Sequence, residues 1–396
     1  MTKKVLIITH AGGSSQLGPN ARWARFAKGL RENDISLTVV GASFFHKYRN
    51  IISAQFLSPC ESKADDLDFI HIWSPRYTGS IKRLLNQLIF SISIFLLSKK
   101  RLTKINPDFV IASSPHPFVV FGAYFWACRL GADFVYESRD LWPKLLNQHF
   151  GMSKLSPYSL MCSYSERFAI SRAKFVITPK QKEFEYYCKY YDFNRVYWIP
   201  NTSKRQSKKV PLQAKSHSIN TLTILYSGSL DTIYLIDELI KAVRILKDIK
   251  LEVLILGEGR KKEYLRSLSE DKSNINFIGW ANGDAYIKYL ATADVCFFGT
   301  TSMAINKYGF SSNKISDYLS FGKPILTHCI EGIDHLVSNG VALQSNPGDI
   351  KCLAGNIKKL YYERQRIDDM SKKARDYYDE YYDYDSVVEK LTEVFK

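Results

Sequence analysis

Side chains that could transfer a proton gather at two points in the first half of the chain. His116 stands between two prolines after an apolar run, and Glu137 and Asp140 flank Arg139 after the next such run. An imidazole can shuttle a proton near neutral pH, and a carboxylate can orient or deprotonate a hydroxyl group. We therefore predict His116, Glu137 and Asp140 as catalytic candidates and Arg139 as a candidate for binding an anion. A surface-loop histidine and a simple Arg–carboxylate pair are the structural alternatives.

Glycines that follow apolar runs mark three further candidate sites. Gly12 and Gly13 follow the first run, Gly228 and Ser229 follow a later one, and Glu258 stands in a Gly-Glu-Gly turn after the next. A glycine at such a position lets backbone N–H groups approach a phosphate or a sugar. The first loop lacks the G-x-G-x-x-G spacing and a suitably placed acidic residue, which argues against a dinucleotide site.

The elements that must position these residues alternate between strand and helix. This alternation is typical of doubly wound parallel sheets. The sequence predicts an α/β protein with two Rossmann-like domains, residues 1–201 and 219–375, joined by a polar linker at 202–218. The predicted strands are 5–9, 37–40, 109–112, 134–137, 175–178, 221–227, 251–256, 275–278 and 295–298, and the predicted helices are 20–31, 119–130, 181–190, 235–248, 261–269, 284–291, 314–319, 350–364 and 386–395.

Positive charge is concentrated in the first half. The net charge is +16, and residues 1–200 carry 27 Lys and Arg against 14 Asp and Glu. A half this basic attracts anionic partners: a membrane surface, a diphosphate or a nucleic acid. No recognised nucleic-acid-binding module accompanies the charge, so we expect no nucleic-acid partner.

Cysteines and carboxylates give no sign of a metal site. The seven cysteines include no C-x-x-C pair, and their number is odd, which disfavours both zinc ligation and a disulfide framework. No D-x-D dyad occurs in a suitable loop, and Asp65-Asp66 lies in a charged stretch. We expect reduced cysteines, no metal and no cofactor. Since no secretory h-region follows the first residues, we also expect a cytoplasmic location.

Residues 80–104 combine an apolar run with basic ends. Ten of the residues from Leu84 to Leu97 are Leu, Ile or Phe, with Lys82-Arg83 before them and Lys99-Lys100-Arg101 after them. The run is too short to span a bilayer, which takes about 20 apolar residues. A helix lying on an anionic membrane surface fits this pattern. An ordinary buried helix covering the sheet is the alternative, and both can hold in part.

Several ordered motifs resemble one enzyme family. The chain reads S-S-N-K-I-S-D-Y-L-S-F-G-K-P-I from residue 311 to 325, and further similar motifs lie at 112–115, 139–143, 199–201, 224–229, 254–259, 278–280 and 293–295. In this order they resemble the retaining family-4 glycosyltransferases with the GT-B fold, in particular the bacterial branch that builds O-antigen and capsule. The resemblance covers nearly the whole chain.

The resemblance implies donor-site roles mainly for the second half. In this family the donor lies in a cleft between the domains and is held mainly by the second one. Asp317 matches the carboxylate that accepts the ribose hydroxyls, and Lys314 would add positive charge beside the diphosphate. The full implied donor set is Gly228, Ser229, Glu258, Arg260, Ile278, Ser312, Asn313, Lys314 and Asp317, while Gly12, Gly13 and Arg139 are expected on the acceptor side.

The chain departs from the wider family at two places. Gly309 stands eight positions before Asp317, where most relatives carry a Glu that contacts the donor sugar. The Arg and Lys that often follow the Gly228 region are also missing. Stabilisation of the leaving group is then expected from Lys314, Arg260 and helix N-termini.

The resemblance implies an enzyme that moves a sugar from a nucleotide-sugar, with UDP favoured, to a saccharide acceptor with retention of configuration. A lipid-diphosphate-linked acceptor and peripheral attachment to the inner face of a bacterial membrane through residues 80–104 are implied with it. Residues 376–396 are expected to form a helix packing back on the first domain. Another GT-B enzyme such as a nucleotide-sugar epimerase, and a basic nucleic-acid-binding protein, are the alternative functions.

Overall fold

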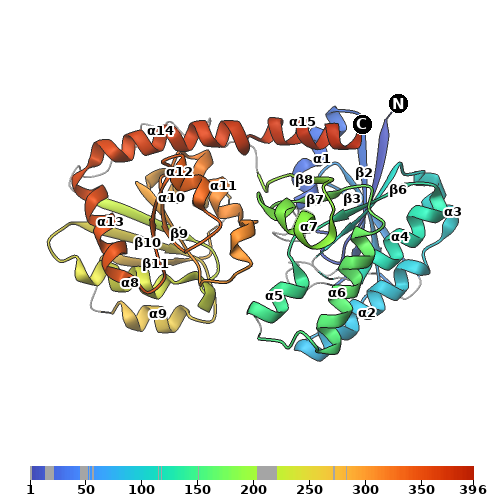
Figure 1. The fold of residues 1–396 in the computed structure, drawn as a ribbon, viewed down its shortest axis with the longest axis horizontal. Helices are drawn as coiled ribbons and strands as arrows, with labels where there is room; N and C mark the ends of the chain where they lie inside the picture. The colour runs from blue at the N-terminus through green and yellow to red at the C-terminus, as the bar shows by residue number, and fades with distance from the viewer. Residues whose placement is uncertain are drawn as a thin grey trace. The chain divides into compact units, whose positions relative to one another are not determined.

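The chain forms two compact α/β units in a computed structural model (Figure 1). The structure describes residues 2–13, 22–44, 52, 54–55, 58–114, 116, 118–149, 151–202, 221–270, 273–281 and 283–396. One unit comprises residues 1–200 with 387–396, and the other comprises residues 201–386. Apart from Thr202, the predicted linker 202–218 lies outside the described residues, as does the start of the helix predicted from residue 20.

The first unit is built on a sheet in which eight described strands follow the order β3-β4-β2-β1-β5-β6-β7-β8. Every neighbouring pair is parallel except β3 with β4. Strand β5 is buried along its whole length, as expected for a parallel strand covered on both faces. The strands are β1 (Lys3–Ile8), β2 (Ile35–Ala42), β3 (Cys60–Ala64), β4 (Leu67–Ile72), β5 (Phe109–Ser113), β6 (Asp133–Glu137), β7 (Val176–Thr178) and β8 (Val196–Trp198).

Helices cover this sheet, and the end of the chain joins them. The helices are α1 (Arg22–Glu32), α2 (Ser80–Phe95), α3 (Lys99–Ile105), α4 (Val119–Leu130), α5 (Trp142–His149), α6 (Pro157–Ile170), α7 (Glu183–Tyr191) and the greater part of α15 (Tyr384–Phe395). Phe395 of α15 is fully buried, with its ring 5.3 Å from that of Phe109 and 6.3 Å from that of Phe175. Residues 387–396 are therefore part of the core of the first unit.

The second unit contains a parallel sheet whose six described strands follow the order β11-β10-β9-β12-β13-β14. The strands are β9 (Leu222–Ser227), β10 (Leu251–Leu256), β11 (Ile275–Gly279), β12 (Val295–Gly299), β13 (Ile325–His328) and β14 (Ala342–Ser345). The helices are α8 (Ile236–Ile245), α9 (Lys262–Leu268), α10 (Gly283–Thr292), α11 (Asn313–Ser320), α12 (Asp334–Ser338), α13 (Ile350–Tyr362) and α14 (Arg364–Tyr381). The expected fold class, two Rossmann-like parallel-sheet domains, is confirmed.

Several segments differ from the sequence-based expectation, and strands β3, β4, β8, β13 and β14 were not predicted at all. The charged stretch around Asp65-Asp66 is the turn of the β3–β4 hairpin, and both residues have positive φ there. The helix predicted at 350–364 stops at Tyr362, because Glu363 leaves the helical region with φ −101° and ψ 65°. A separate helix, α14, follows, so the tyrosines expected before the last helix lie largely within α14 itself.

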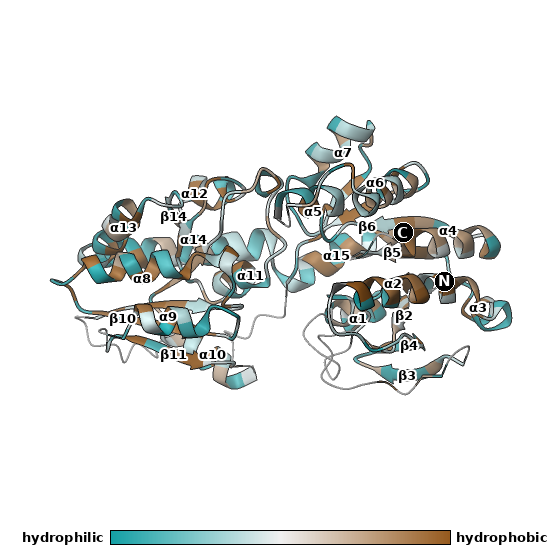
Figure 2. Ribbon diagram, turned by 90° about the horizontal axis from the view of Figure 1, so that it is seen from below, coloured by the Kyte–Doolittle hydropathy of each residue, from teal (hydrophilic) through white to brown (hydrophobic). Residues whose placement is uncertain are grey.

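Residues 80–105, which include the apolar run at 84–97, form two helices with a bend between them rather than one continuous helix. Helix α2 ends at Phe95, and α3 leaves at 77° to it after a short break. Among the described residues no single helix has the length and apolar content to cross a membrane, although this bent pair meets those two criteria when its members are taken together. Figure 2 shows the hydrophobic residues along α2 in brown.

Candidate functional site

Two glycine turns meet at the carboxyl edge of the second sheet. Strands β9 and β10 end in register, with Ser227 beside Leu256, so Gly228 and Gly257 are neighbours. Their φ angles are +140° and +144°, a conformation that L side chains rarely adopt. A Cβ atom on Gly257 would lie 1.8 Å from the Gly228 carbonyl oxygen. Both positions therefore require glycine, and neither residue has a side chain of its own to cover the backbone at this edge.

Lys314 lies directly over Gly228. A Cβ atom on that glycine would lie 2.1 Å from the Lys314 Cε atom. The Lys314 ammonium donates a hydrogen bond to the Tyr226 hydroxyl at 3.0 Å and stands 3.7 Å from the centroid of the Tyr234 ring. It makes no ion pair with any carboxylate that the structure describes, and burial lowers its pKa to about 7. The site thus holds an amine that aromatic faces orient and that no carboxylate of the described residues neutralises.

Asp317 lies one turn further along α11, within a network of hydroxyl groups. The Tyr286 hydroxyl donates to Asp317 Oδ2 at 3.2 Å, and the Ser227 hydroxyl lies 3.2 Å from that of Tyr286 and 3.1 Å from that of Tyr318. The Tyr318 hydroxyl also accepts from the Ser227 N–H. Burial, with the nearby Asp317 charge, raises the pKa of Tyr286. The network ties the carboxylate to the end of β9.

The start of α11 presents backbone donors beside these side chains. Ser312 precedes the helix in an extended conformation and its hydroxyl does not cap it. Asn201 holds the loop by donating from its side chain to the Ser311 carbonyl at 2.7 Å. The first N–H groups of a helix have no acceptor within it, and the helix dipole favours an anion there. Asn313, at the first helical position, is exposed.

The remaining donor-site candidates are more exposed. Glu258 pairs with Lys262 at 2.6 Å, and Arg260 pairs with Asp231 at 3.1 Å while its side chain stays 89% exposed. The Ser229 hydroxyl donates to the same Asp231 at 2.5 Å. Ile278 is 37% exposed at the end of β11. These residues share the carboxyl edge of the sheet with Gly228, but intramolecular pairs already hold Arg260 and Glu258.

Gly309 has a structural reason to be glycine. It follows a short 3₁₀ turn, Asn306–Tyr308, with φ 95° and ψ −179°, and its N–H donates to the Asn306 carbonyl at 2.8 Å. Only glycine visits this region of φ and ψ without strain. The chain is thus shaped here for a residue without a side chain, and the glutamate of the wider family would be strained at this position.

His116 in the first unit is buried rather than on the surface. It is 1% exposed, its Nδ1 accepts from the Phe118 N–H at 3.3 Å, and its ring lies 4.9 Å from that of His10. Burial, with smaller contributions from His10 and Arg83, lowers its pKa well below the ordinary value. His116 is therefore neutral with the proton on Nε2, which is buried and has no hydrogen-bond partner among the described residues. The surface-loop alternative is wrong.

Glu137 is engaged within the core of the first unit. It is fully buried, Arg22 Nε donates to Oε1 at 2.7 Å, and Trp23 Nε1 donates to Oε2 at 2.9 Å. The Ser113 hydroxyl donates to Oε2 as well. Arg22 further donates to the Ile199 carbonyl at 2.6 Å. These contacts engage both carboxylate oxygens of Glu137 inside the core, and its catalytic role stays a prediction.

The sequence neighbours of Glu137 are more accessible to solvent. Asp140 has a side chain 40% exposed and lies 3.7 Å from Lys180. Arg139 is half-buried, and its backbone N–H donates to the Ser114 hydroxyl at 2.9 Å. Gly12 is packed against β2, since a Cβ atom there would lie 2.9 Å from Val39 Cγ1. Packing thus accounts for Gly12, and the neighbouring Gly13 is buried as well.

The structure adds residues that the sequence did not single out. Tyr234 and Tyr286 contact Lys314 and Asp317 respectively, yet both lie in segments whose pattern only suggests helix or turn. Arg22 was expected only as a member of the first helix. No group of three or more His, Cys, Asp or Glu side chains within the described ranges is arranged to hold a metal ion.

Two family descriptions match the chain. "Glycosyltransferase Family 4" matches residues 18–202, and "Glycosyl transferases group 1" matches residues 221–363. The chain is therefore a glycosyltransferase of the group 1 and family 4 type, with the GT-B fold. No curated protein matches it.

Solved structures show the same fold over the whole chain at low identity. Sucrose-phosphate synthase from Thermosynechococcus elongatus has a TM-score of 0.73 at 13% identity, covering 99% of this chain and 98% of its own. HepE from Anabaena, in complex with UDP-glucose, has a TM-score of 0.67 at 13% identity, covering 99% and 98%. WaaG, a glycosyltransferase involved in lipopolysaccharide biosynthesis, has a TM-score of 0.65 at 14% identity, covering 99% of both chains.

Proposed function

We propose that this glycosyltransferase uses a UDP-sugar and transfers the sugar, with retention of configuration, to a lipid-linked saccharide in bacterial surface polysaccharide synthesis. The observation that carries the donor assignment is the Lys314 ammonium held over Gly228 without a carboxylate partner among the described residues. A cation in such a setting is a good match for a phosphate group. HepE, one of the similar structures, binds UDP-glucose, which supports the choice of UDP.

In the proposed donor site the diphosphate lies between Gly228, Lys314 and the start of α11. The Lys314 ammonium and the backbone N–H groups of residues 312–314 would offset its charge, and no metal ion is invoked. Asp317 would accept the two ribose hydroxyls, and the backbone of Ile278 would contact the base. The hydrogen bond from Tyr286 orients the Asp317 carboxylate before the donor binds, so binding would cost little side-chain entropy at Asp317.

The proposed transfer needs no nucleophile from the enzyme. The acceptor hydroxyl oxygen bonds to the anomeric carbon on the face from which the diphosphate departs, so configuration is retained. The bond between the anomeric carbon and the phosphate oxygen breaks, and the acceptor proton passes to the leaving phosphate. Lys314 would stabilise the charge that develops on that phosphate. Asp140, Arg139 and the Nε2–H of His116 are the proposed acceptor-side groups.

The reaction is tested by release of UDP. Purified enzyme is incubated with UDP-glucose or UDP-N-acetylglucosamine, with and without lipid-linked saccharides extracted from bacterial membranes, and the product is examined by NMR. We expect UDP release that depends on the acceptor, and an anomeric coupling constant equal to that of the donor. An inverted product would refute retention, and equal UDP release without acceptor would refute transfer to a saccharide.

We also propose that residues 80–104 rest on an anionic membrane. Helix α2 packs one face on α4, where a Cβ atom on Gly122 would lie 2.6 Å from Ile94 Cγ2 and where Ile94 is fully buried. Its other face exposes Ile81, Leu85 and Ile92 by 85%, 53% and 60%. The helix is thus partly a core helix and partly free for lipid.

Helix α6 contacts α2 and carries further exposed apolar side chains. Its Tyr158 hydroxyl donates to Gln87 of α2 at 3.4 Å, and Leu160, Met161 and Tyr164 of α6 are also exposed. Burying such side chains in a lipid interface stabilises binding, with lysines such as Lys82 adding attraction to anionic headgroups.

Sedimentation with phosphatidylglycerol vesicles tests the membrane proposal. The variant Ile81→Ser/Leu85→Ser/Ile92→Ser should lose most of its sedimentation. The matched control Ile245→Ser/Tyr264→Ser/Tyr362→Ser, which removes exposed apolar side chains from the second unit, should keep it. Equal sedimentation of the two variants would refute the role of α2.

A further inference from the structure

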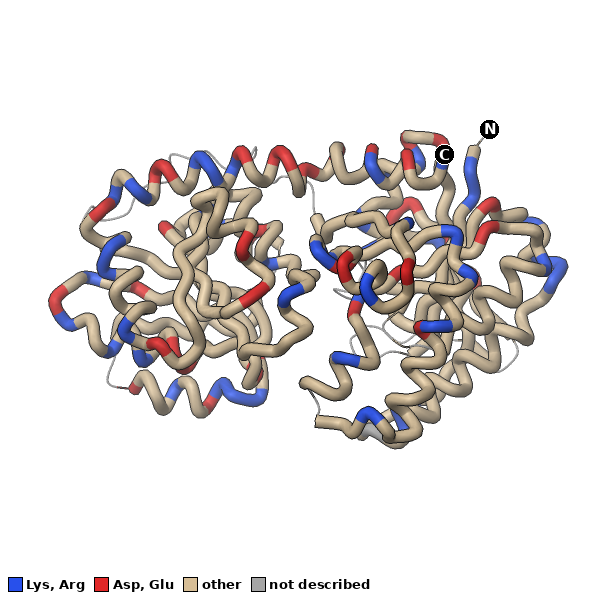
Figure 3. The backbone as a smooth tube through the Cα atoms, viewed as in Figure 1, with Lys and Arg blue, Asp and Glu red and all other residues tan. Residues whose placement is uncertain are grey.

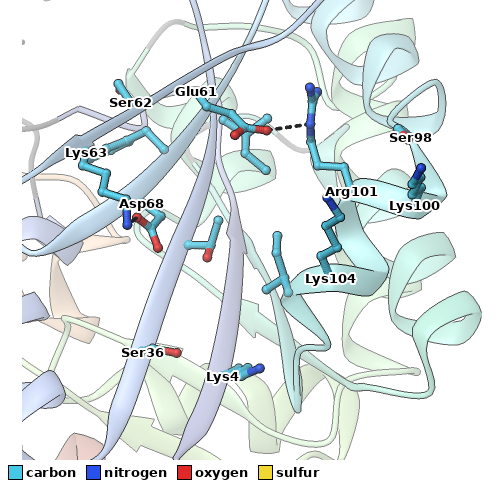
Figure 4. A pocket seen from close by; sticks show the side chains of 14 residues that line it. Lys4, Ser36, Glu61, Ser62, Lys63, Asp68, Ser98, Lys100, Arg101 and Lys104 are labelled. Carbon is cyan, nitrogen blue, oxygen red and sulfur yellow. Dashed lines mark ion pairs between the residues drawn. The ribbon is translucent and has the colours of Figure 1, made fainter.

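A hollow of about 810 Å³ lies at the amino edge of the first sheet, where the parallel strands begin (Figure 4). Strands β1, β2 and β4 form its floor, and β3 and α3 form its walls. His116 and the glycine turns belong to the carboxyl edges of their sheets, so this hollow is separate from both groups. Its volume is in the range of small-molecule sites.

The floor of the hollow is polar although it faces a helix. The register pairs Lys4 with Ser36 and Thr38 with Asp68, which places these side chains in rows across the same sheet face. Two residues further along the strands the same face is apolar and buried, as at Leu6, Val40 and Ile70. A sheet face under a helix is normally apolar throughout. The polar side chains therefore mark a part of the sheet face that is accessible to solvent at this edge.

Positive charge in the hollow exceeds what its carboxylates neutralise. Arg101 Nε pairs with Glu61 at 2.7 Å, and Lys63 Nζ pairs with Asp68 at 2.9 Å.

Three lysines remain: Lys4, Lys100 and Lys104, whose ammonium groups make no ion pair or hydrogen bond with any residue that the structure describes. Figure 4 shows Lys100, Lys104 and Arg101 projecting from α3, and Figure 3 shows the basic residues gathered there. Lys4 from β1 and two lysines from α3 therefore line the same hollow.

We propose that this hollow binds a polyol phosphate: a phosphate group that carries a hydroxyl-rich moiety. The ammonium groups of Lys4, Lys100 and Lys104 would hold the phosphate as point charges. The hydroxyls of Ser36 and Thr38 on the floor would hydrogen-bond the polyol. The proposal does not depend on the donor site, since the two share no residue.

Two sources supply this chemistry, a soluble sugar phosphate and the headgroup of a phosphatidylglycerol-type lipid. Glycerol 3-phosphate serves as the soluble probe, in titration calorimetry with the full chain. Vesicles of equal parts phosphatidylcholine and phosphatidylglycerol serve as the lipid probe, in sedimentation. The test variant is Lys4→Gln/Lys100→Gln/Lys104→Gln. Its control, Lys247→Gln/Lys250→Gln/Lys351→Gln, removes the same charge from exposed positions of the second unit.

We expect the test variant to bind one probe about tenfold more weakly, or worse, than the control variant does. A loss confined to glycerol 3-phosphate identifies a soluble ligand. Vesicles with phosphatidylserine in place of phosphatidylglycerol carry the same charge, so a loss on phosphatidylglycerol vesicles alone identifies the lipid headgroup, and an equal loss on both vesicle types overturns it. Equal binding by the two variants in both assays, or no binding of either probe by the native chain, overturns the proposal. Stabilisation by UDP should be the same in both variants, so failure here is distinguishable from failure of the proposed donor site.

Discussion

Replacing Lys314 by Met should stabilise the free protein and weaken binding of UDP. Methionine keeps a flexible side chain of similar length over Gly228 but removes the ammonium group. In the free protein that ammonium makes no ion pair with a described carboxylate, and burial lowers its pKa from 10.5 to about 7. The folded state therefore holds this charge less readily than the unfolded state does.

The sign and size of the effect on stability follow from this shift. The pKa of Lys314 is lower in the folded state than in the unfolded state, so the unfolded chain binds more protons between about pH 7 and 10.5. The free-energy cost of burying the charged amine therefore shrinks as pH rises through that window. Each pKa unit corresponds to about 1.4 kcal/mol. Since Lys314 is only half-buried, we expect only part of the free energy that the whole pKa shift corresponds to. Lys314→Met should therefore raise the free energy of unfolding by about 1–3 kcal/mol at pH 7.

Binding of UDP should change in the opposite direction. A hydrogen bond to a charged group contributes about 1.5–3 kcal/mol. At about 1.4 kcal/mol for each tenfold change, the Met variant should bind UDP about 10-fold to 100-fold more weakly. Titration calorimetry measures this loss. Uridine, which lacks the diphosphate, should bind the variant and the native chain equally.

Lys314→Arg is the matched control, because arginine stays charged at all accessible pH values. In the native chain the affinity for UDP should fall as pH rises above about 7, where free Lys314 loses its proton. The Arg variant should show no such fall from that group. A Met variant that is less stable than the native chain and binds UDP with unchanged affinity would refute the reasoning.

Three further predictions concern residues elsewhere. Gly309→Glu forces a side chain onto φ 95° and ψ −179° and should lower the free energy of unfolding by about 1–3 kcal/mol in urea; an unchanged midpoint would contradict the strain. Glu137→Gln leaves the buried Arg22 guanidinium without its counter-ion and should cost about 3–5 kcal/mol in the same assay, whereas a small cost would show that Arg22 finds other partners. The pKa of buried His116 lies well below its unfolded value of 6.5, so stability should fall as pH drops from about 7 to 5. His116→Phe should make that fall shallower, and an identical pH profile would count against a buried neutral histidine.

The sequence predicted the positions of glycines and strands better than the roles of polar side chains. Gly228 and the turn at Gly257 were recognised because a glycine directly after an apolar run usually marks a tight turn at the end of a strand, and their φ angles supply the reason. Glu137 could not be assigned from sequence, because its partner Arg22 is 115 residues away and nothing local indicates the pair. The burial of His116 likewise depends on a neighbour, His10, from the turn that follows the distant strand β1.

Helix ends and irregular pairings were also beyond the sequence. The break between α2 and α3 falls within a run of apolar and basic residues whose sequence gives no sign of a helix end. Only the fold shows that α3 turns away from α2 and lines the hollow. The β3–β4 hairpin was missed because its β3 strand is short and polar, with a turn that two aspartates form at positive φ. Tyr286 was missed because a tyrosine on an amphipathic helix is usually a core residue.

Thermal unfolding with nucleotides tests the central claim, a UDP-sugar site at the end of β9, most directly. The native chain, Asp317→Ala and the control Asp376→Ala, an exposed position on α14, are each melted with UDP, GDP, ADP and CMP. A ligand at 100 times its Kd adds about 2.7 kcal/mol. We expect UDP alone to raise the melting temperature of the native chain and of Asp376→Ala by several degrees, and we expect Asp317→Ala to lose this shift. No shift with any nucleotide at millimolar concentration, or an undiminished shift in Asp317→Ala, would contradict it.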